Sequence, residues 1–177
     1  MMITTGLIIT AAGSGTRFGN NTCKCLTLLS GKPLILHSID TLKSFQFENI
    51  IITVPEKIKK QFEEVVLPKY PDIQLITGGE TRKESVEKAV KKLINCDMLM
   101  IHDAARPLLS KKLVQDLFSV DQDKKAVIPG IPVTDTIKIT KNNHVISTPE
   151  RATLKTIQTP QRFHTKRLLK AYKSPVD

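Results

Sequence analysis

The chain has 177 residues, which suits one domain with a sizeable core, and its 40% hydrophobic and 25% charged residues are ordinary for a folded protein. No apolar run reaches the roughly 20 residues that a membrane-spanning helix needs. The net charge of +10 suits nucleic acid or small polyanionic substrates, but the 6 Phe and 2 Tyr do not interleave with basic residues as a base-stacking platform requires. We therefore expect no nucleic-acid and no membrane partner.

Apolar runs alternate with amphipathic ones along most of the chain. The pattern predicts buried strands over 6–10, 49–54, 73–77, 98–101 and 125–129, and helices over 33–43, 56–67, 81–94 and 110–120. Thr81 and Glu84 have the spacing of a capping box. No basic residue precedes the first apolar stretch, so we expect a strand there and not a secretory signal. The alternation predicts an α/β fold, with a mostly parallel, Rossmann-like sheet flanked by helices.

The region 132–158 breaks this rhythm. Residues 136–140 alternate like a half-exposed strand, Lys141 to Asn143 suit a hairpin turn, and residues 144–146 suit the returning strand. A hairpin this polar is only marginally stable by itself in water. It is therefore either a surface flap or an arm that packs on another subunit. We expect one domain, 1–177, with a protruding β-hairpin arm at 132–158.

The three cysteines, Cys23, Cys25 and Cys96, are an odd number. We expect reduced, structural thiols in a cytoplasmic protein. Cys23-Lys24-Cys25 invites a metal interpretation, but two ligands without a further His or Cys group nearby cannot close a zinc site.

A glycine-rich loop, 11–19, follows the first strand. Small residues there let backbone N–H groups approach phosphate oxygens at the carboxyl edge of the sheet. The loop fits neither the dinucleotide fingerprint nor the P-loop pattern, and Gly-Ser-Gly alone is typical of a flexible turn. Arg17 and Lys24 favour phosphoryl chemistry, because that transition state needs fixed positive charge.

Five stretches in order carry a resemblance to a known family. They are Ala11 to Arg17 with Lys24, Gly78 to Val86, His102 to Pro107, Asp135 to Lys138, and Gln158 to Phe163. The first resembles the nucleotide loop of sugar-phosphate nucleotidyltransferases. Together they are similar to the 2-C-methyl-D-erythritol 4-phosphate cytidylyltransferase family of non-mevalonate isoprenoid biosynthesis, over nearly the whole chain.

The resemblance implies transfer of CMP from CTP to the polyol phosphate, with release of pyrophosphate and with Mg²⁺ held mainly by the phosphates. It also implies a homodimer in which the arm reaches the second subunit. The implied catalytic residues are Arg17, Lys24 and Arg151. The implied nucleotide-binding residues are Ala11, Ala12, Gly13, Gly15, Gly79, Glu80, Ser85 and Asp103, and the implied substrate-binding residues are Asp103, Arg106, Thr136, Arg151 and Thr159.

Taken without the resemblance, several of these residues have plainer interpretations. Asp103 suits a loop cap, Arg106 and Arg151 suit solvated surface charges, and Ser85 suits an exposed residue in a first helical turn. Gly78-Gly79 suits a plain turn. His102 is expected to be packed or hydrogen-bonded and not a catalyst, because the attacking phosphate is already an anion and needs no general base.

Three features depart from the family pattern. Cys23 and Cys25 stand where proline and glutamine are usual, and Glu80 stands where aspartate is common. The sequence ends at Asp177, whereas the family continues with a further substrate threonine, a strand and a phosphate-binding lysine. We therefore expect weak activity or poor stability for the chain as written.

Three alternatives remain at this stage. One is the related ribitol 5-phosphate cytidylyltransferase, with the same chemistry and a different acceptor. Another is a shortened, non-catalytic nucleotide-binding paralogue. The third, a basic nucleic-acid-binding domain, is disfavoured by the missing aromatic platform and helix-turn-helix spacing.

Overall fold

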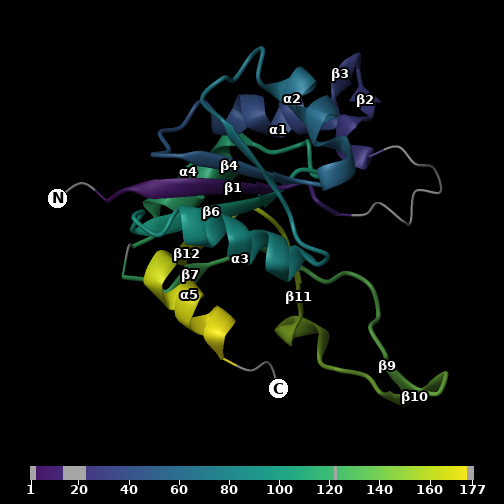
Figure 1. Cartoon of the computed structure of the whole chain (residues 1–177). Coiled ribbons are helices and arrows are strands. Elements are labelled where there is room, and N and C mark those ends of the chain that lie inside the picture. The colour runs from purple at the N-terminus through teal and green to yellow at the C-terminus, as the bar shows by residue number, and fades with distance from the viewer. Residues whose placement is uncertain (1–2, 14–22, 122, 175–177) are drawn as a thin grey trace.

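A computed structural model describes residues 3–13, 23–121 and 123–174 of the protein. Its centre is a six-stranded sheet (Figure 1) whose strands are, in spatial order, β5 (Gln74–Thr77), β4 (Ile50–Val54), β1 (Thr5–Thr10), β6 (Met98–Asp103), β12 (Gln161–His164) and β7 (Ala126–Val127). The first four run parallel, and β12 is antiparallel to both of its neighbours. The predicted mostly parallel α/β sheet is confirmed.

Helices cover both faces of the sheet because successive strand residues point to opposite sides. Leu7 and Ile9 of β1 join one core with α1, α2 and α4, whereas Ile8 joins a second core with α3 and α5. Figure 1 shows these two layers on either side of the strands. The helices are α1 (Leu34–Leu42), α2 (Lys59–Val66), α3 (Arg82–Lys92), α4 (Lys111–Ser119) and α5 (Thr165–Lys173), with 3-10 turns η2 (Lys24–Leu26), η3 (Glu56–Ile58) and η4 (Arg151–Thr153).

Two helix starts follow side-chain caps. The Thr81 hydroxyl accepts the Glu84 N–H at 3.1 Å, and the Ser110 hydroxyl accepts the Leu113 N–H at 3.2 Å. Each such cap stabilises its helix by about 1 kcal/mol. The Glu84 carboxylate accepts the N–H of Glu80 at 2.9 Å, one residue before the position a capping box uses. The Glu84 side chain therefore orders the loop before α3 as well as the first turn of the helix.

Three short antiparallel ribbons lie outside the central sheet. They are β2 (Leu28–Leu29) with β3 (Lys32–Pro33), β8 (Gly130–Pro132) with β11 (Lys155–Ile157), and β9 (Ile139–Lys141) with β10 (His144–Ser147). Asn142 and Asn143 have φ of 50° and 61° between β9 and β10, as a tight hairpin requires. The predicted hairpin is confirmed, and it extends away from the helices and the sheet (Figure 1).

Some elements differ from the sequence-based expectation. The strand expected over 125–129 pairs in the sheet only at Ala126–Val127, because the chain then leaves the sheet for the ribbon of β8. The helix expected from Glu56 begins as the 3-10 turn η3. The strand β12 was not predicted. It inserts between β6 and β7 through backbone pairing with residues about sixty positions earlier in β6 and about 35 positions earlier in β7.

Candidate active site

A cavity of about 660 Å³ opens at the carboxyl edge of the sheet, where parallel α/β folds bind ligands. We call it the edge cavity. The ends of β1 and β6, the loop before α3 and the turn η2 all contribute to its wall. Its lining residues are Thr10, Ala12, Gly13, Lys24, Glu80, Thr81, Arg82, Asp103, Ala105 and Arg106. The structure thus brings together six of the predicted site residues from four separate stretches of the chain.

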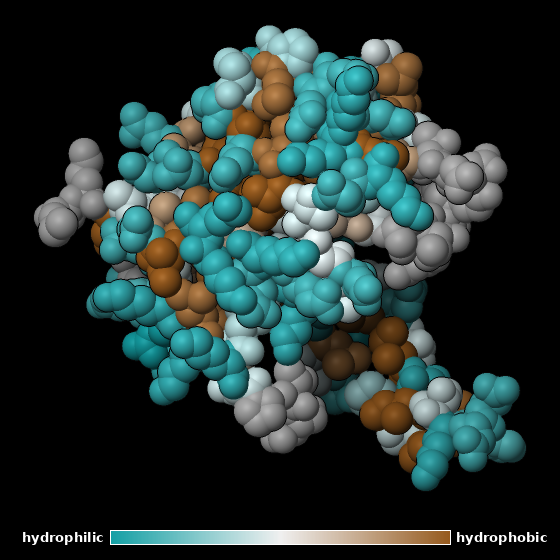
Figure 2. Space-filling view, in the orientation of Figure 1, coloured by the Kyte–Doolittle hydropathy of each residue, from teal (hydrophilic) through white to brown (hydrophobic). Residues whose placement is uncertain are grey.

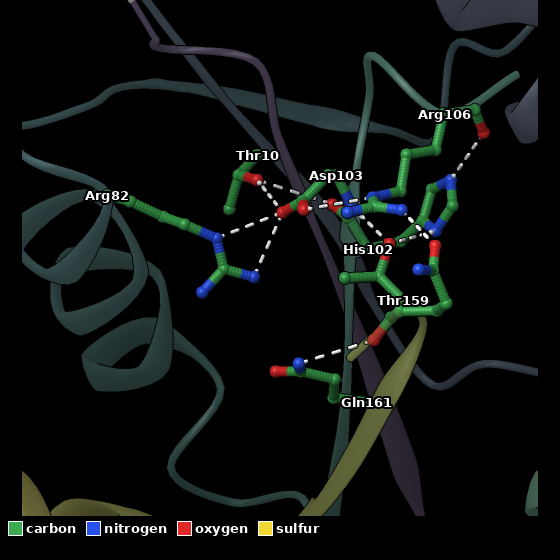
Figure 3. Close-up of polar contacts among 8 residues, drawn as sticks. Thr10, Arg82, His102, Asp103, Arg106, Thr159 and Gln161 are labelled. Carbon is green, nitrogen blue, oxygen red and sulfur yellow. Dashed lines mark hydrogen bonds and ion pairs between the residues drawn. The ribbon is translucent and has the colours of Figure 1, made fainter. Parts of the chain in front are cut away.

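Asp103, the last residue of β6, lies at the centre of the polar contacts (Figure 3). Its Oδ1 accepts the Thr10 hydroxyl at 3.1 Å and lies 2.9 Å from both Nε and Nη2 of Arg82. Its Oδ2 lies 3.5 Å from Nε of Arg106. The Asp103 carboxylate is therefore held between two guanidinium groups. With Lys24, the cavity has three cationic side chains against the two carboxylates of Asp103 and Glu80. Such a group of cations suits a bound polyphosphate.

Beneath Asp103, His102 and Thr159 form a buried hydrogen-bonded pair. His102 is fully buried, with Nε2 3.2 Å from the Arg106 carbonyl and Nδ1 3.1 Å from the Thr159 hydroxyl. A carbonyl can only accept, so Nε2 carries the proton and Nδ1 accepts from the Thr159 O–H. The Thr159 oxygen in turn accepts the Asp103 N–H at 3.2 Å. Burial lowers the pKa of His102 to about 4, so the ring is neutral at pH 7 and acts as the expected packed histidine.

Thr159 does not line the edge cavity but lines a second cavity beside it, and its substrate contact stays a prediction. Its side chain is buried and its hydroxyl is engaged with His102 and Asp103 in this single chain. Both directions of its hydrogen bonding are in use. The geometry makes Thr159 a support for the end of β6, whatever it also contacts when a substrate binds.

Gly78 packs against Ala12 of the first loop, and Gly79 packs against Glu84 of α3, more closely than any side chain would permit. A Cβ on Gly78 would lie 2.3 Å from Cβ of Ala12, and a Cβ on Gly79 would lie 2.3 Å from Cβ of Glu84. Both glycines are therefore required by close approach, and the plain-turn interpretation is wrong for them. Lys88 Nζ further fixes the Gly78 carbonyl at 2.7 Å.

Ser85 is buried, contrary to the plain expectation of an exposed residue. Its hydroxyl accepts the N–H of Gly79 at 2.9 Å and donates to the Thr81 carbonyl at 2.9 Å. The side chain of Ser85 thus holds the shape of the loop whose neighbouring residue, Glu80, lines the edge cavity.

Lys24 begins η2 and lines two cavities at once. The second cavity, of about 620 Å³, is walled mainly by aliphatic side chains, among them Leu29, Leu108 and Ile131, and shares Lys24, Ala105 and Arg106 with the edge cavity. We call it the side cavity. Gln158 lies on its wall and its side-chain oxygen accepts a hydrogen bond from Arg106. The two cavities therefore meet at Lys24 and Arg106.

Thr136 and Arg151 are not brought to the edge cavity within one chain. Both are exposed, and Arg151 donates to the Thr134 carbonyl at 3.0 Å. Gly15 and Arg17 lie outside the described residues. Ala11 is buried at the end of β1, where its N–H bonds to the Thr53 carbonyl at 2.8 Å.

The sequence motifs gave no role to Thr10, Arg82 or Gln158. Thr10 and Arg82 contact Asp103 (Figure 3), and Gln158 accepts a hydrogen bond from Arg106. Arg82 could have been found, since it stands in the Gly78 to Val86 motif. Nothing in the sequence alone joins it to Asp103, 21 residues away.

A resident metal centre would need several ligands close together. Within residues 3–13, 23–121 and 123–174, no three His, Cys, Asp or Glu side chains are grouped in a way that could hold a metal ion. Two carboxylates, Glu80 and Asp103, do line the edge cavity. Mg²⁺ binds proteins through one or two carboxylates plus substrate phosphates, so this pair fits a metal that arrives with the nucleotide. Among the helices of the described ranges, none has the length and apolar character to cross a membrane.

Comparisons with known proteins agree over most of the chain. Residues 5–176 match the family model described as 2-C-methyl-D-erythritol 4-phosphate cytidylyltransferase (IspD). Proteins of that name from Bacillus thuringiensis (strain Al Hakam) and Clostridioides difficile (strain 630) are 37% and 36% identical to this chain over 175 and 170 residues. The matches cover 95% and 94% of this chain, and 76% and 72% of the relatives.

Solved structures show the same likeness. The 4-diphosphocytidyl-2C-methyl-D-erythritol synthase of Anaerococcus prevotii DSM 20548 superposes with a TM-score of 0.82 at 28% identity, covering 97% of this chain and 74% of that one. The bifunctional IspDF of Campylobacter jejuni also gives 0.82, at 32% identity, covering 98% of this chain and 44% of that one. The edge cavity therefore lies in a fold and a sequence shared with these proteins.

Proposed function

Because this chain belongs to the 2-C-methyl-D-erythritol 4-phosphate cytidylyltransferase family, we propose that it transfers CMP from CTP to 2-C-methyl-D-erythritol 4-phosphate and releases pyrophosphate. One observation from the structure supports this most directly. Lys24, Arg82 and Arg106 all line the edge cavity, and both arginines contact Asp103 at the carboxyl edge of the sheet. A triphosphate and a second phosphate need such a concentration of fixed cations.

The nucleotide would bind across the two glycine-containing loops. We assign the triphosphate to the backbone of Ala11, Ala12, Gly13 and Gly15, and the cytosine to the loop of Gly79, Glu80 and Ser85. The close packing of Gly78 on Ala12 supports this division, because it makes one continuous surface from the two loops. Ser85 would act mainly by fixing the Gly79 amide, to which its hydroxyl is bonded.

The transfer itself needs little covalent help from the protein. An oxygen of the acceptor phosphate attacks the α-phosphorus of CTP, the bond to the bridging oxygen breaks, and pyrophosphate carries away the electron pair. We assign Arg17 and Lys24 to the charge that develops on the α-phosphoryl oxygens and the leaving group. Asp103 and Arg106 would orient the ribose and the acceptor. Because the attacking phosphate is already an anion, the step needs no general base, which agrees with a neutral and buried His102.

A magnesium ion bound by the phosphates would neutralise charge on the leaving pyrophosphate. Asp103 is the carboxylate that could complete its ligands, since Glu80 is assigned to the cytosine. In this arrangement Arg82 has a separate task. By binding Asp103 Oδ1 it keeps the carboxylate turned toward the cavity wall before substrates arrive.

We further propose a single domain, 1–177, that forms a homodimer through the arm at 132–158. The arm exposes Ile137, Ile139, Val145 and Ile146, and Figure 2 shows hydrophobic surface gathered on it. Exposed aliphatic side chains on a polar ribbon favour burial against a partner. A partner's arm would bring Thr136 and Arg151 to an edge cavity that they do not reach in their own chain. Free cysteines and the use of CTP favour a cytoplasmic location.

Pyrophosphate release tests the proposal. The protein is incubated with Mg²⁺ and CTP, and with methylerythritol 4-phosphate or ribitol 5-phosphate as acceptor. Turnover with the first acceptor alone is expected. Turnover only with ribitol phosphate would change the assigned acceptor, CTP binding without turnover would indicate a non-catalytic paralogue, and salt-sensitive DNA binding alone would refute the enzyme.

A matched pair of lysine variants separates site chemistry from general charge. Lys24→Ala should reduce turnover by about 100-fold or more, the scale for one lost charge-stabilising group. Lys92→Ala removes an exposed lysine of α3 and should leave turnover near normal. Equal effects of the two substitutions would contradict the role assigned to Lys24.

A further inference from the structure

The residues on either side of Lys24 are both cysteines, and the structure brings their side chains together. Cys23 is partly exposed, whereas Cys25 is buried in the core beneath α1, and both are free thiols. The two thiols are close enough that each shifts the pKa of the other. The third cysteine, Cys96, is buried in the core on the opposite face of the sheet. The chain therefore holds one adjacent pair of thiols and one isolated thiol.

We propose that Cys23 and Cys25 form an oxidisable dithiol, a modification site for peroxide, whose disulfide displaces Lys24 from the edge cavity. Two consecutive Cα–Cα steps of about 3.8 Å keep the pair within about 7.6 Å, and the turn of η2 shortens this span. A disulfide needs a Cα–Cα distance of about 4.4–6.8 Å. The bond is thus within reach after small local changes.

The two thiols differ in the way that such a pair requires. The neighbouring Cys25 thiol lowers the pKa of Cys23, and the neighbouring Cys23 thiol together with burial raises the pKa of Cys25. Cys23 is also the more exposed of the two. A thiolate that solvent can reach is the first to react, and a protonated neighbour is the resolving thiol.

The chemistry balances with hydrogen peroxide as the oxidant. The Cys23 sulfur attacks one peroxide oxygen and the O–O bond breaks. Cys23 becomes a sulfenic acid, and the other peroxide oxygen leaves as water. The Cys25 sulfur then attacks the Cys23 sulfur, the S–O bond breaks, and a second water leaves. Two thiols have lost two electrons and two protons, and the peroxide has become two waters.

The expected consequence for Lys24 follows from its place between the two sulfurs. The new ring contains the whole Lys24 backbone, so closing it changes the backbone dihedral angles of the turn at Lys24. Lys24 lines both the edge cavity and the side cavity, so this change redirects its ammonium group. A displacement of about 1 Å can reduce catalysis on the order of 100-fold. The link to turnover rests on the proposed function, whereas the dithiol chemistry does not.

The thiol chemistry is tested on the full chain, reduced and then treated with hydrogen peroxide. Intact mass should fall by two hydrogen atoms, with loss of two of the three thiols and recovery on reduction. Peptide mapping should place the bond between residues 23 and 25. Cys96→Ala is the matched control and should behave as the wild type. Cys23→Ser and Cys25→Ala should form no internal disulfide, and Cys25→Ala should instead accumulate a sulfenic acid at Cys23 that dimedone traps.

Two readouts follow the displacement of Lys24. Labelling with an amine reagent, read by mass spectrometry, should change at Lys24 between the reduced and oxidised forms while Lys92 is unaffected. Turnover of CTP should fall at least about tenfold on oxidation in the wild type and in Cys96→Ala. An absent disulfide, a bond that involves Cys96, or an oxidised form with unchanged Lys24 labelling and turnover would overturn the proposal. A reduced protein without turnover would instead refute the proposed function, and the thiol and labelling results would still decide the dithiol.

Discussion

The hydroxyl of Thr159 provides a direct test of how the end of β6 is held. It donates to His102 Nδ1 and accepts the Asp103 N–H, at 3.1 Å and 3.2 Å. Thr159→Val keeps the shape of the side chain and removes both hydrogen bonds. If Thr159 supports the site in this way, the protein without any substrate should already be less stable.

The expected loss in the free energy of unfolding depends on how deeply the two groups that lose their partner, His102 Nδ1 and the Asp103 N–H, are buried. A buried polar atom without a partner destabilises by about 1–3 kcal/mol. His102 is fully buried and should bear most of this loss, whereas the partly exposed Asp103 can regain water. We expect about 2 kcal/mol in total. At this chain length that corresponds to a fall in Tm of about 4–8 °C.

The assay is thermal and urea denaturation of the protein alone, with Thr159→Ser as the matched control. Serine keeps the hydroxyl and loses only a methyl group, so its stability should lie closer to the wild type than that of valine. The measurement is repeated with CTP to see whether ligand restores the difference. Equal stability of the valine variant and the wild type would refute the supporting role and leave Thr159 as a substrate contact alone.

Three other predictions concern separate parts of the fold. Gly78→Ala places a Cβ 2.3 Å from that of Ala12 and should weaken CTP binding at least about tenfold, as titration calorimetry would reveal; unchanged affinity would argue against a shared surface. Burial lowers the pKa of His102 to about 4, so the stability that comes from its neutral form is fully present above about pH 6.5 and is lost as pH falls toward 4. The free energy of unfolding, measured in urea, should fall by up to about 3 kcal/mol across that range. A profile that does not change with pH would contradict the burial argument. Partial burial alone would raise the pKa of Asp40, but hydrogen bonds from Lys32, Tyr70 and Lys69 outweigh it and lower the pKa to about 2. Asp40→Asn should therefore destabilise the protein by about 1 kcal/mol at pH 7, and this difference should vanish as pH falls from about 4 toward 2. A difference that persists at pH 2 would exclude an ionic origin.

The sequence by itself determined the layered α/β architecture. Strands such as 50–54 are mostly apolar and buried throughout because both of their faces are covered, and the helices between them carry one apolar face each. Local chemistry also marked the Thr81 cap and the Asn142-Asn143 turn, since both depend on residues adjacent in the chain. The glycines at 78 and 79 were visible as a motif, although not the contacts that require them.

Tertiary structure alone decided the features that depend on distant partners. The β12 segment, Gln161–His164, has little strand signal of its own, and its place between β6 and β7 comes from backbone pairing across the chain. Likewise, Thr159 meets His102 and Arg82 meets Asp103 only because strand order places them side by side. Periodicity reports which face of an element is buried and not which element covers it, so the charged cavity became visible only once the strands were in order.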